Sequence, residues 1–300
     1  MSSVVETKRK EGIFTLLNAG TQSPLVLDSP HSGKTSPNDF NTIISDHDLR
    51  GTEDIDVDVL FDPAITANTI PFLKAEFPRS YIDVNRAEDD IDLTMIEGDW
   101  PYQVKTSSRS HNGIGLIRKL CDPDTPMYEH KLSPEDVENR INTYYHNYHN
   151  ALDELITSMH DFYGQVWHIN CHSMPSSSAP VATAGPVIHP TLAKADMVLG
   201  DRDGTSCSLE FTYLVRDILK NLGYKVVLNN PYKGLEIVRR HGRPHAGFHS
   251  LQLEINRAIY IDEDSFEYTK HFEHLQNDLS KMVNSVIHYC QSKLINLAAD

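Results

Sequence analysis

Short runs of apolar and β-branched residues, separated by segments with helical periodicity, constrain the fold of this chain more than any other feature. We predict strands over residues 25–27, 80–84, 166–171, 225–228 and 250–255. Runs of this length between helices are typical of strands that are buried on both faces of a parallel sheet. The alternation therefore predicts an α/β fold with a mostly parallel mixed sheet and helices on both faces.

The spacing of the apolar residues predicts three helices. The clearest begins after Ser133, which has the properties of an N-cap and precedes a proline, and it ends at Gly164. Two more are expected over residues 210–222, before Gly223, and within residues 266–297. These helices would pack on the faces of the sheet.

Two long segments, 86–131 and 173–206, are rich in turn-forming residues and show little periodicity. Neither resembles a repeat or a low-complexity linker. We expect both to be long site loops, because loops of this length in a compact fold are more often functional than idle. We therefore predict a single domain over residues 1–300.

The charge of the chain restricts the partners that it can have. The net charge is −15, and the 27 Lys and Arg residues are mostly scattered singly. This distribution argues against nucleic acid and against an anionic membrane surface as partners. A small anionic substrate would need a local group of arginines to overcome the overall field.

The cysteines and the first residues both favour the cytoplasm. The four cysteines are widely spaced and form no C-x-x-C pair, which predicts free thiols in a reducing compartment. The first ten residues contain a basic cluster but no apolar stretch after it, so we do not expect a secretory signal.

Two histidines have the positions expected of metal ligands. His31 and His172 each follow an apolar run and begin a turn-rich segment, which is where the carboxyl ends of parallel strands place a site. A catalytic zinc takes three protein ligands and keeps one open position. Residues 51–58 offer Glu53 and Asp54 among four carboxylates as an oxygen ligand, although spacing alone favours an acidic helix start that faces solvent.

A second group of polar residues is suited to a carboxylate. Asn85 and Arg86 follow the strand that we predict over residues 80–84. The planar guanidinium matches a carboxylate and the amide adds a directed donor. The alternative is an ordinary surface ion pair between Arg86 and Glu88 or Asp89.

Two further features could contribute to such a site. Arg239, Arg240 and Arg243 lie close together in an otherwise acidic chain and could supply the local positive field. Glu254 lies in an alternating run, on the same face as Gln252, and could act as the base that takes a proton from water at a metal ion. The alternative for Glu254 is an edge-strand position that faces water.

Six motifs in order resemble the N-formylglutamate amidohydrolase family over residues 24–262. They are Ser-Pro-His-Ser-Gly at 29–33, Glu-Asp-x-x-Val-Asp-x-Leu-Phe at 53–61, Asp-x-Asn-Arg at 83–86, Cys-His-Ser-Met-Pro at 171–175, Gly-Asp-Arg-x-Gly-Thr-Ser-Cys at 200–207 and Leu-Gln-Leu-Glu at 251–254. The family is similar to the zinc carboxypeptidases and aspartoacylase. The resemblance implies a phosphorylase/hydrolase-like α/β fold.

The resemblance also implies roles for individual residues. His31 and His172 match zinc ligands, and one acid of the adjacent pair would be the third. We favour Asp54 over Glu53 because it matches the aspartate of the family's Asp-x-x-Val pattern. Glu254 matches the general base.

The substrate-binding residues follow from the same resemblance. Asp83, Asn85 and Arg86 match a motif in which Asn and Arg hold the substrate carboxylate, and Arg239 matches an arginine in the loop before the base. The motif of Asp201, Arg202 and Gly204 matches the family without an assigned role.

The activity implied is zinc-dependent hydrolysis of the linear amide of N-formyl-L-glutamate to formate and L-glutamate, a step of histidine degradation. Another divalent ion could replace zinc. A related amidase could act on another N-acyl amino acid or a short peptide. A protein that binds a metal and a ligand without turnover is the alternative outside enzymes.

Overall fold

The computed structural model describes residues 6–182 and 194–297. Within them, eight strands form one sheet in the order β1-β2-β4-β3-β5-β8-β6-β7. The strands are β1 (Lys8–Lys10), β2 (Phe14–Leu17), β3 (Leu25–Ser29), β4 (Phe72–Ala75), β5 (Val166–Met174), β6 (Met197–Gly200), β7 (Val226–Leu228) and β8 (Phe248–Asn256).

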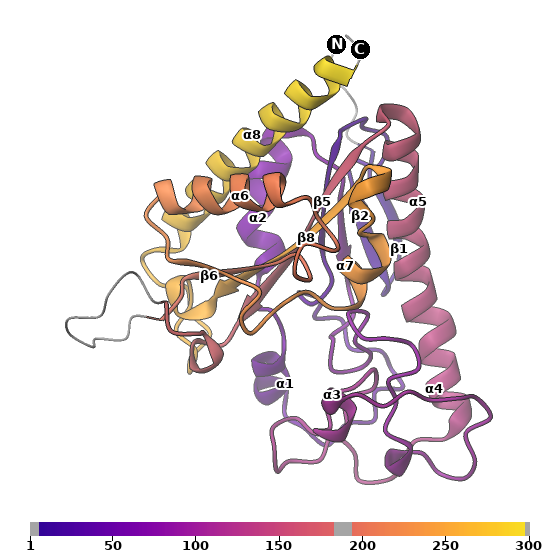
Figure 1. Cartoon of the computed structure of the whole chain (residues 1–300). Coiled ribbons are helices and arrows are strands. Elements are labelled where there is room, and N and C mark those ends of the chain that lie inside the picture. Colours follow the sequence, from indigo (N-terminus) through magenta and orange to yellow (C-terminus); the bar gives the residue numbers. More distant parts are fainter. Residues whose placement is uncertain (1–5, 183–193, 298–300) are drawn as a thin grey trace.

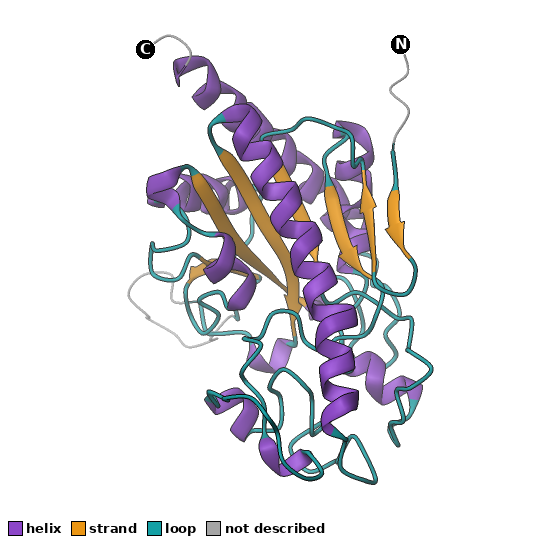
Figure 2. Ribbon diagram, turned by 90° about the vertical axis from the view of Figure 1, so that its right-hand side faces the viewer, coloured by secondary structure: helices purple, strands orange, loops and turns teal. Residues whose placement is uncertain are grey.

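The centre of the sheet is parallel. β4, β3, β5 and β8 run in the same direction, and β6 pairs with β7 in parallel. The antiparallel pairs are β1 with β2, β2 with β4, and β6 with β8. The predicted mostly parallel mixed sheet is confirmed. In Figure 2 the central strands point toward the end of the molecule where most of the loops gather.

Helices cover both faces of this sheet (Figure 1). One face packs against α2, α6 and α8, through a core that includes Leu27 and Ile169. The other face packs against α5, through a core that includes Val26 and Leu152. The helices are α1 (Asp46–Thr52), α2 (Val57–Asn68), α3 (Ser108–His111), α4 (Pro134–Arg140), α5 (His146–Tyr163), α6 (Leu209–Asn221), α7 (Glu236–His241) and α8 (Phe272–Leu297).

The three predicted helices are confirmed with small changes at their ends. Ser133 caps α4 by accepting a hydrogen bond from the backbone N–H of Asp136 over 3.1 Å, and Gly164 ends α5 with a φ of 75°. A π-helical turn joins α4 to α5. The last helix begins only at Phe272; before it, Phe266 has a positive φ of 59° and Tyr268 forms an isolated bridge with Ile261.

The prediction of a strand over residues 80–84 is wrong. This segment forms a turn in which Tyr81 N–H donates to Pro78 O and Arg86 N–H donates to Asp83 O, each over 3.0 Å. Its apolar residues are buried in the core on the α5 face, which explains why the pattern resembled a strand. The strand of this region is β4, which lies upstream.

The prediction of a continuous loop over residues 173–206 is also wrong. Strand β5 extends to Met174, and β6 lies inside the segment as the antiparallel neighbour of β8. The short run of Met197, Val198 and Leu199 is fully buried, which explains why it forms a strand. Residues 183–193 lie outside the described part of the chain.

Two predictions from composition can be compared with the structure. The cysteines are free thiols, as expected: Cys121, Cys171, Cys207 and Cys290. Among the described residues, no helix is both long enough and apolar enough to cross a membrane.

Candidate functional site

The two histidines lie at the carboxyl ends of neighbouring central strands. His31 follows the last residue of β3 by two positions, and His172 is close to the end of β5. Because β3 and β5 pair in parallel, these ends meet at the same edge of the sheet. Both side chains are at most 2% exposed, and their ring centroids are 4.7 Å apart.

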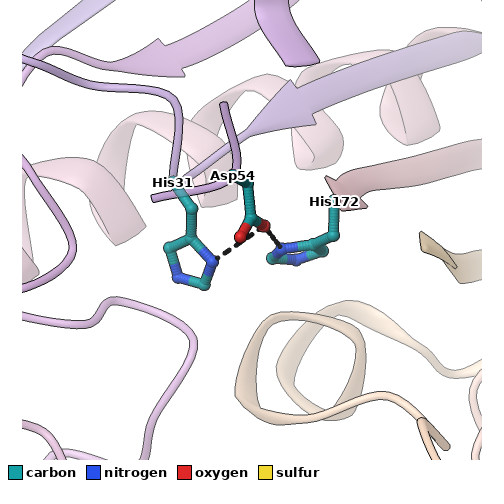
Figure 3. Close-up of side chains that lie close together, drawn as sticks. All are labelled: His31, Asp54 and His172. Carbon is teal, nitrogen blue, oxygen red and sulfur yellow. Dashed lines mark hydrogen bonds and ion pairs between the residues drawn. The ribbon is translucent and has the colours of Figure 1, made fainter. Parts of the chain in front are cut away.

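Asp54 completes a group of three ligand-type side chains with these histidines. It lies between α1 and α2, where its backbone N–H donates to the carbonyl oxygen of His31 over 3.0 Å. Its Oδ2 atom is 2.7 Å from Nδ1 of His172 and 3.3 Å from Nδ1 of His31 (Figure 3). One ligand atom from each residue lies within 4.8 Å of the others. Two imidazole nitrogens and a carboxylate oxygen suit a metal ion such as zinc.

The hydrogen bonds on the far side of each ring show that this group fits a cation. Nε2 of His31 lies 2.7 Å from Oδ1 of Asp83, and Nε2 of His172 lies 2.6 Å from Oδ1 of Asn170. Both partners are acceptors, so we assign the ring hydrogen to each Nε2 and a lone pair to each Nδ1. Both lone pairs then point at the Asp54 carboxylate. A bound cation stabilises this arrangement, which otherwise brings acceptors together.

Positive side chains keep Asp54 ionised. Nη1 of Arg79 lies 3.0 Å from Oδ1 of Asp54, and Nη2 of Arg257 lies 3.5 Å from the same atom. Burial by itself raises the pKa of Asp54, but the charge of Arg79 opposes it, and this pKa lies well below its usual range. The carboxylate is therefore available as an anionic ligand.

Glu53, the alternative oxygen ligand, points elsewhere. Its Oε2 atom accepts a hydrogen bond from Nη1 of Arg50 over 2.5 Å. Burial raises the pKa of Glu53 to about 7, although Arg50 opposes this shift. Of the adjacent pair, the structure brings Asp54 to the histidines and pairs Glu53 with an arginine.

Glu254 lies beside the histidines on the next strand. In the parallel pair of β5 and β8, Glu254 is the register partner of His172, and its side chain is 6% exposed. β8 lies between β5 and β6, so the edge-strand alternative does not hold. Nε2 of Gln252 donates to Oε1 of Glu254 over 2.8 Å. Burial raises the pKa of Glu254 to about 7, which suits a group that accepts and returns a proton near neutral pH.

A cavity of about 500 Å³ opens beside these residues. Its wall includes both histidines, Asn85 and Glu254. Five arginines also line it: Arg79, Arg86, Arg109, Arg118 and Arg257. Arg79, Arg86 and Arg257 are paired with Asp54 or Asp83, and the wall also contains Asp48 and Asp122.

Four of these arginines, Arg79, Arg109, Arg118 and Arg257, were not predicted from the sequence. Arg118 donates to the carbonyl oxygen of Cys121 over 3.3 Å, and burial, reinforced by Arg79, lowers its pKa to about 10. Within residues 6–182 and 194–297, neither Arg109 nor Arg118 forms an ion pair with a carboxylate. Both belong to the predicted site loop of residues 86–131. They stand nine positions apart, so no local cluster in the sequence indicates them.

The residues of the Asp-x-Asn-Arg motif lie in two places: Asn85 and Arg86 line the cavity, and Asp83 contacts His31. Asn85 lines the cavity, and its Oδ1 atom accepts a hydrogen bond from the backbone N–H of Ile237 over 3.0 Å. Arg86 is only 6% exposed and lies 3.5 Å from Asp83, so it does not form the surface ion pair considered above. Asp83 contacts His31 and is absent from the described cavity wall.

Arg239 is not brought to this cavity. Its side chain is 56% exposed and forms a two-point ion pair with Glu236, at 2.7 and 2.6 Å. It lines a neighbouring cavity that shares Asn85, Arg86 and Arg109 with the first one.

The Asp201 motif shapes a loop close to the cavity. Oδ1 of Asp201 accepts hydrogen bonds from the backbone N–H of Gly204 and from Nδ2 of Asn229, at 2.9 and 2.7 Å. Arg202 donates to the carbonyl oxygen of Gly234 over 3.2 Å. These contacts fix the loop that carries Tyr232 into the cavity wall.

Fold and site together define a class: an α/β protein with a buried His-Asp-His group suited to a metal ion, beside an arginine-lined cavity. A family model described as N-formylglutamate amidohydrolase matches residues 23–261. The chain therefore belongs to the N-formylglutamate amidohydrolase family.

Individual relatives agree with this membership. A crystal structure of N-formylglutamate amidohydrolase from Ralstonia eutropha JMP134 is similar with a TM-score of 0.86 and 40% identity, and the match covers 94% of this chain and 99% of that one. N-formylglutamate deformylases from Pseudomonas putida and Pseudomonas aeruginosa are each 25% identical, over 250 and 271 residues. Those matches cover 82% and 88% of this chain and 85% and 90% of the relatives.

Proposed function

We propose that this protein is a zinc-dependent amidohydrolase that cleaves N-formyl-L-glutamate to formate and L-glutamate. The observation that carries the proposal is the convergence of Nδ1 of His31, Nδ1 of His172 and Oδ2 of Asp54, with Glu254 in register beside His172. The names of the relatives support the choice of substrate.

The residues present would hold the metal and share the chemistry with it. His31, Asp54 and His172 would bind zinc or another divalent ion, with Asp83 and Asn170 holding the two rings in place. A zinc ion at this position supplies Lewis-acid chemistry, which acidifies water and polarises the amide carbonyl.

Glu254 moves the proton. Its carboxylate would accept a proton from the attacking water and return it to the nitrogen of the leaving glutamate, and in the protein without metal burial raises its pKa to about 7. The hydrogen bond from Gln252 to Oε1 orients the carboxyl group, so that Oε2 is the atom that exchanges the proton. Arg79 and Arg257 lie on the same wall and add positive charge where the carbonyl oxygen becomes negative.

The arginines without a carboxylate partner bind the substrate. A substrate with two carboxylates restores the ion pairs that Arg109 and Arg118 lack in the described chain. Arg86 and Asn85 lie on the same wall and would orient the carboxylate nearest the amide.

The volume of the cavity favours a second candidate of the same reaction class. About 500 Å³ lies in the range of pockets that bind drug-sized ligands, which leaves room for an acyl group larger than formyl. Another N-acyl amino acid or a short acidic peptide is therefore the second candidate substrate.

The test is glutamate release from N-formyl-L-glutamate by protein as isolated, after chelation and after return of zinc. We expect activity that chelation removes and zinc restores. N-formyl-L-leucine, which lacks a second carboxylate, is the matched control substrate. Zinc-loaded protein that cleaves N-acetyl but not N-formyl glutamate would shift the assignment to the second candidate. Bound zinc without cleavage of any N-acyl amino acid or short acidic peptide would contradict an enzymatic function.

A further inference from the structure

A chain of buried hydrogen bonds leads from His172 away from the cavity and into the core. Nε2 of His172 donates to Oδ1 of Asn170 over 2.6 Å, and Nδ2 of Asn170 donates to Oδ1 of Asp28 over 2.7 Å. Asn170 and Asp28 are register partners on β5 and β3, and both are fully buried. Burial of a carboxylate costs free energy unless the charge is paired and hydrogen-bonded.

Asp28 is compensated by three donors. Its Oδ1 atom also accepts from Nε2 of His168 over 2.9 Å, and its Oδ2 atom accepts from the hydroxyl of Tyr148 over 2.8 Å. Burial alone raises the pKa of Asp28, but His168, Asn170 and Tyr148 outweigh it and hold the pKa below its usual value. Asp28 is therefore an ionised group that only accepts hydrogen bonds.

An acceptor at this position determines which way the amide of Asn170 points. An asparagine amide has one donor end and one acceptor end, so an ionised Asp28 takes the donor end and leaves the acceptor facing His172. A second contact of His172 would favour a lone pair, rather than a hydrogen, on Nε2. Nδ2 of Asn85, a donor, lies 3.2 Å from the same Nε2 of His172. The shorter contact, to Asn170, places the hydrogen on Nε2.

We propose that Asp28 is a positioning residue that acts through Asn170 to keep the hydrogen of His172 on Nε2, so that Nδ1 remains a lone-pair ligand for the metal. This inference rests on the proposed metal-dependent function. The two histidines are then supported differently: His31 contacts the carboxylate of Asp83 directly, whereas His172 reaches a carboxylate through one amide. Without Asp28, Asn170 can turn over, both neighbouring amides donate to Nε2, and the hydrogen moves to Nδ1.

The first test is Asp28→Asn, with zinc affinity measured by competition against a chromophoric chelator. We expect zinc binding to weaken about 10- to 100-fold, the range seen when a group that orients a metal ligand is lost. Tyr148→Phe is the matched control, because it removes a donor from Oδ2 and leaves the contact between Asp28 and Asn170 intact. It should lower stability while zinc affinity stays at the wild-type value.

The second readout is the tautomer of His172 in metal-free protein, from the ¹⁵N chemical shifts of the imidazoles. We expect the Nε2–H form in wild-type protein and in Tyr148→Phe, and a larger share of the Nδ1–H form in Asp28→Asn. The double exchange Asp28→Asn with Asn170→Asp places the carboxylate directly on His172 Nε2. This variant should recover the Nε2–H form and most of the zinc affinity.

The outcomes separate the two proposals. If wild-type protein binds no zinc, the proposed function fails, and the tautomer of His172 still decides the role of Asp28. A His172 that carries its hydrogen on Nδ1 in wild-type protein overturns the inference, even if Asp28→Asn does not fold. So does an Asp28→Asn protein that loses stability but keeps wild-type zinc affinity and tautomer, since Asp28 would then serve only the core.

Discussion

Replacing Glu254 with glutamine tests the base and its environment in one variant. The amide keeps the shape of the side chain and can still contact Gln252, which donates to Oε1 over 2.8 Å. It cannot take a proton from water. We expect the zinc-loaded variant to bind zinc normally and to lose turnover by about 10²- to 10⁴-fold, the contribution of a positioned general base.

The same variant should be more stable than wild-type protein when the metal is absent. Burial raises the pKa of Glu254 from 4.5 to about 7. At about 1.4 kcal/mol per pKa unit, this shift corresponds to about 3 kcal/mol. Because the folded state holds the proton more tightly than the unfolded state, wild-type stability falls as pH rises from about 4.5 to about 7. Glutamine has no proton to lose, so its advantage grows over this interval and is complete above pH 7.

The assay is denaturant unfolding of both proteins in the presence of a chelator, at pH 5 and pH 8, beside turnover of the zinc-loaded proteins. The other titrating groups are common to both proteins, so the change in their stability difference reports Glu254. A stability difference that is the same at both pH values would refute the argument that burial holds the proton on Glu254. Unchanged turnover would refute its role as base.

Three further predictions concern ligand choice, substrate binding and stability. Asp54→Asn should abolish zinc binding measured by chelator competition, whereas Glu53→Gln, its neighbour, should retain it; the reverse result would contradict the ligand assignment. Arg109→Met should raise KM for N-formyl-L-glutamate about 10- to 100-fold, as expected for a lost charged hydrogen bond, while Arg239→Met changes it little. Equal effects of the two arginine variants would contradict the placement of the substrate. The exposed Arg9 is the main cause that lowers the pKa of Glu76 to about 2. Glu76 should therefore contribute about 1–2 kcal/mol to the free energy of unfolding above pH 4.5, and this contribution should be lost as the pH falls from about 4.5 to 2. The check is the difference between the denaturant midpoints of Glu76→Gln and wild-type protein. If this difference is the same at pH 7 and at pH 3, the assignment to Glu76 is wrong.

The parts of the site that lie on strands could be predicted from the sequence. His31 and His172 follow apolar runs, and the rule that parallel strands end together brings them to one edge. Glu254 was placed on the correct face by the period of two along β8. These predictions depend on local periodicity, which the sequence displays directly.

The parts of the site that depend on turns could not be predicted in this way. Asp54 and Glu53 are adjacent, and the direction of each side chain is set by the irregular connection between α1 and α2. Asp83 was expected to bind substrate, yet the turn that replaces the predicted strand directs it to His31. Arg109 lies on the short helix α3 and lines the same cavity as the histidines only because of the path of the irregular segments around that helix. A turn is specified by a few hydrogen bonds. Its apolar residues are buried without a regular spacing, so the sequence shows no period from which the turn could be predicted.

The loop of residues 86–131 contributes Arg109 and Arg118 to a cavity whose metal-type side chains come from elsewhere in the chain. In the proposed function, the metal ligands and these two arginines therefore come from separate segments of the polypeptide. Under that proposal, exchange of this segment would change the acid that is recognised, while the sheet edge that holds the metal ligands would stay the same.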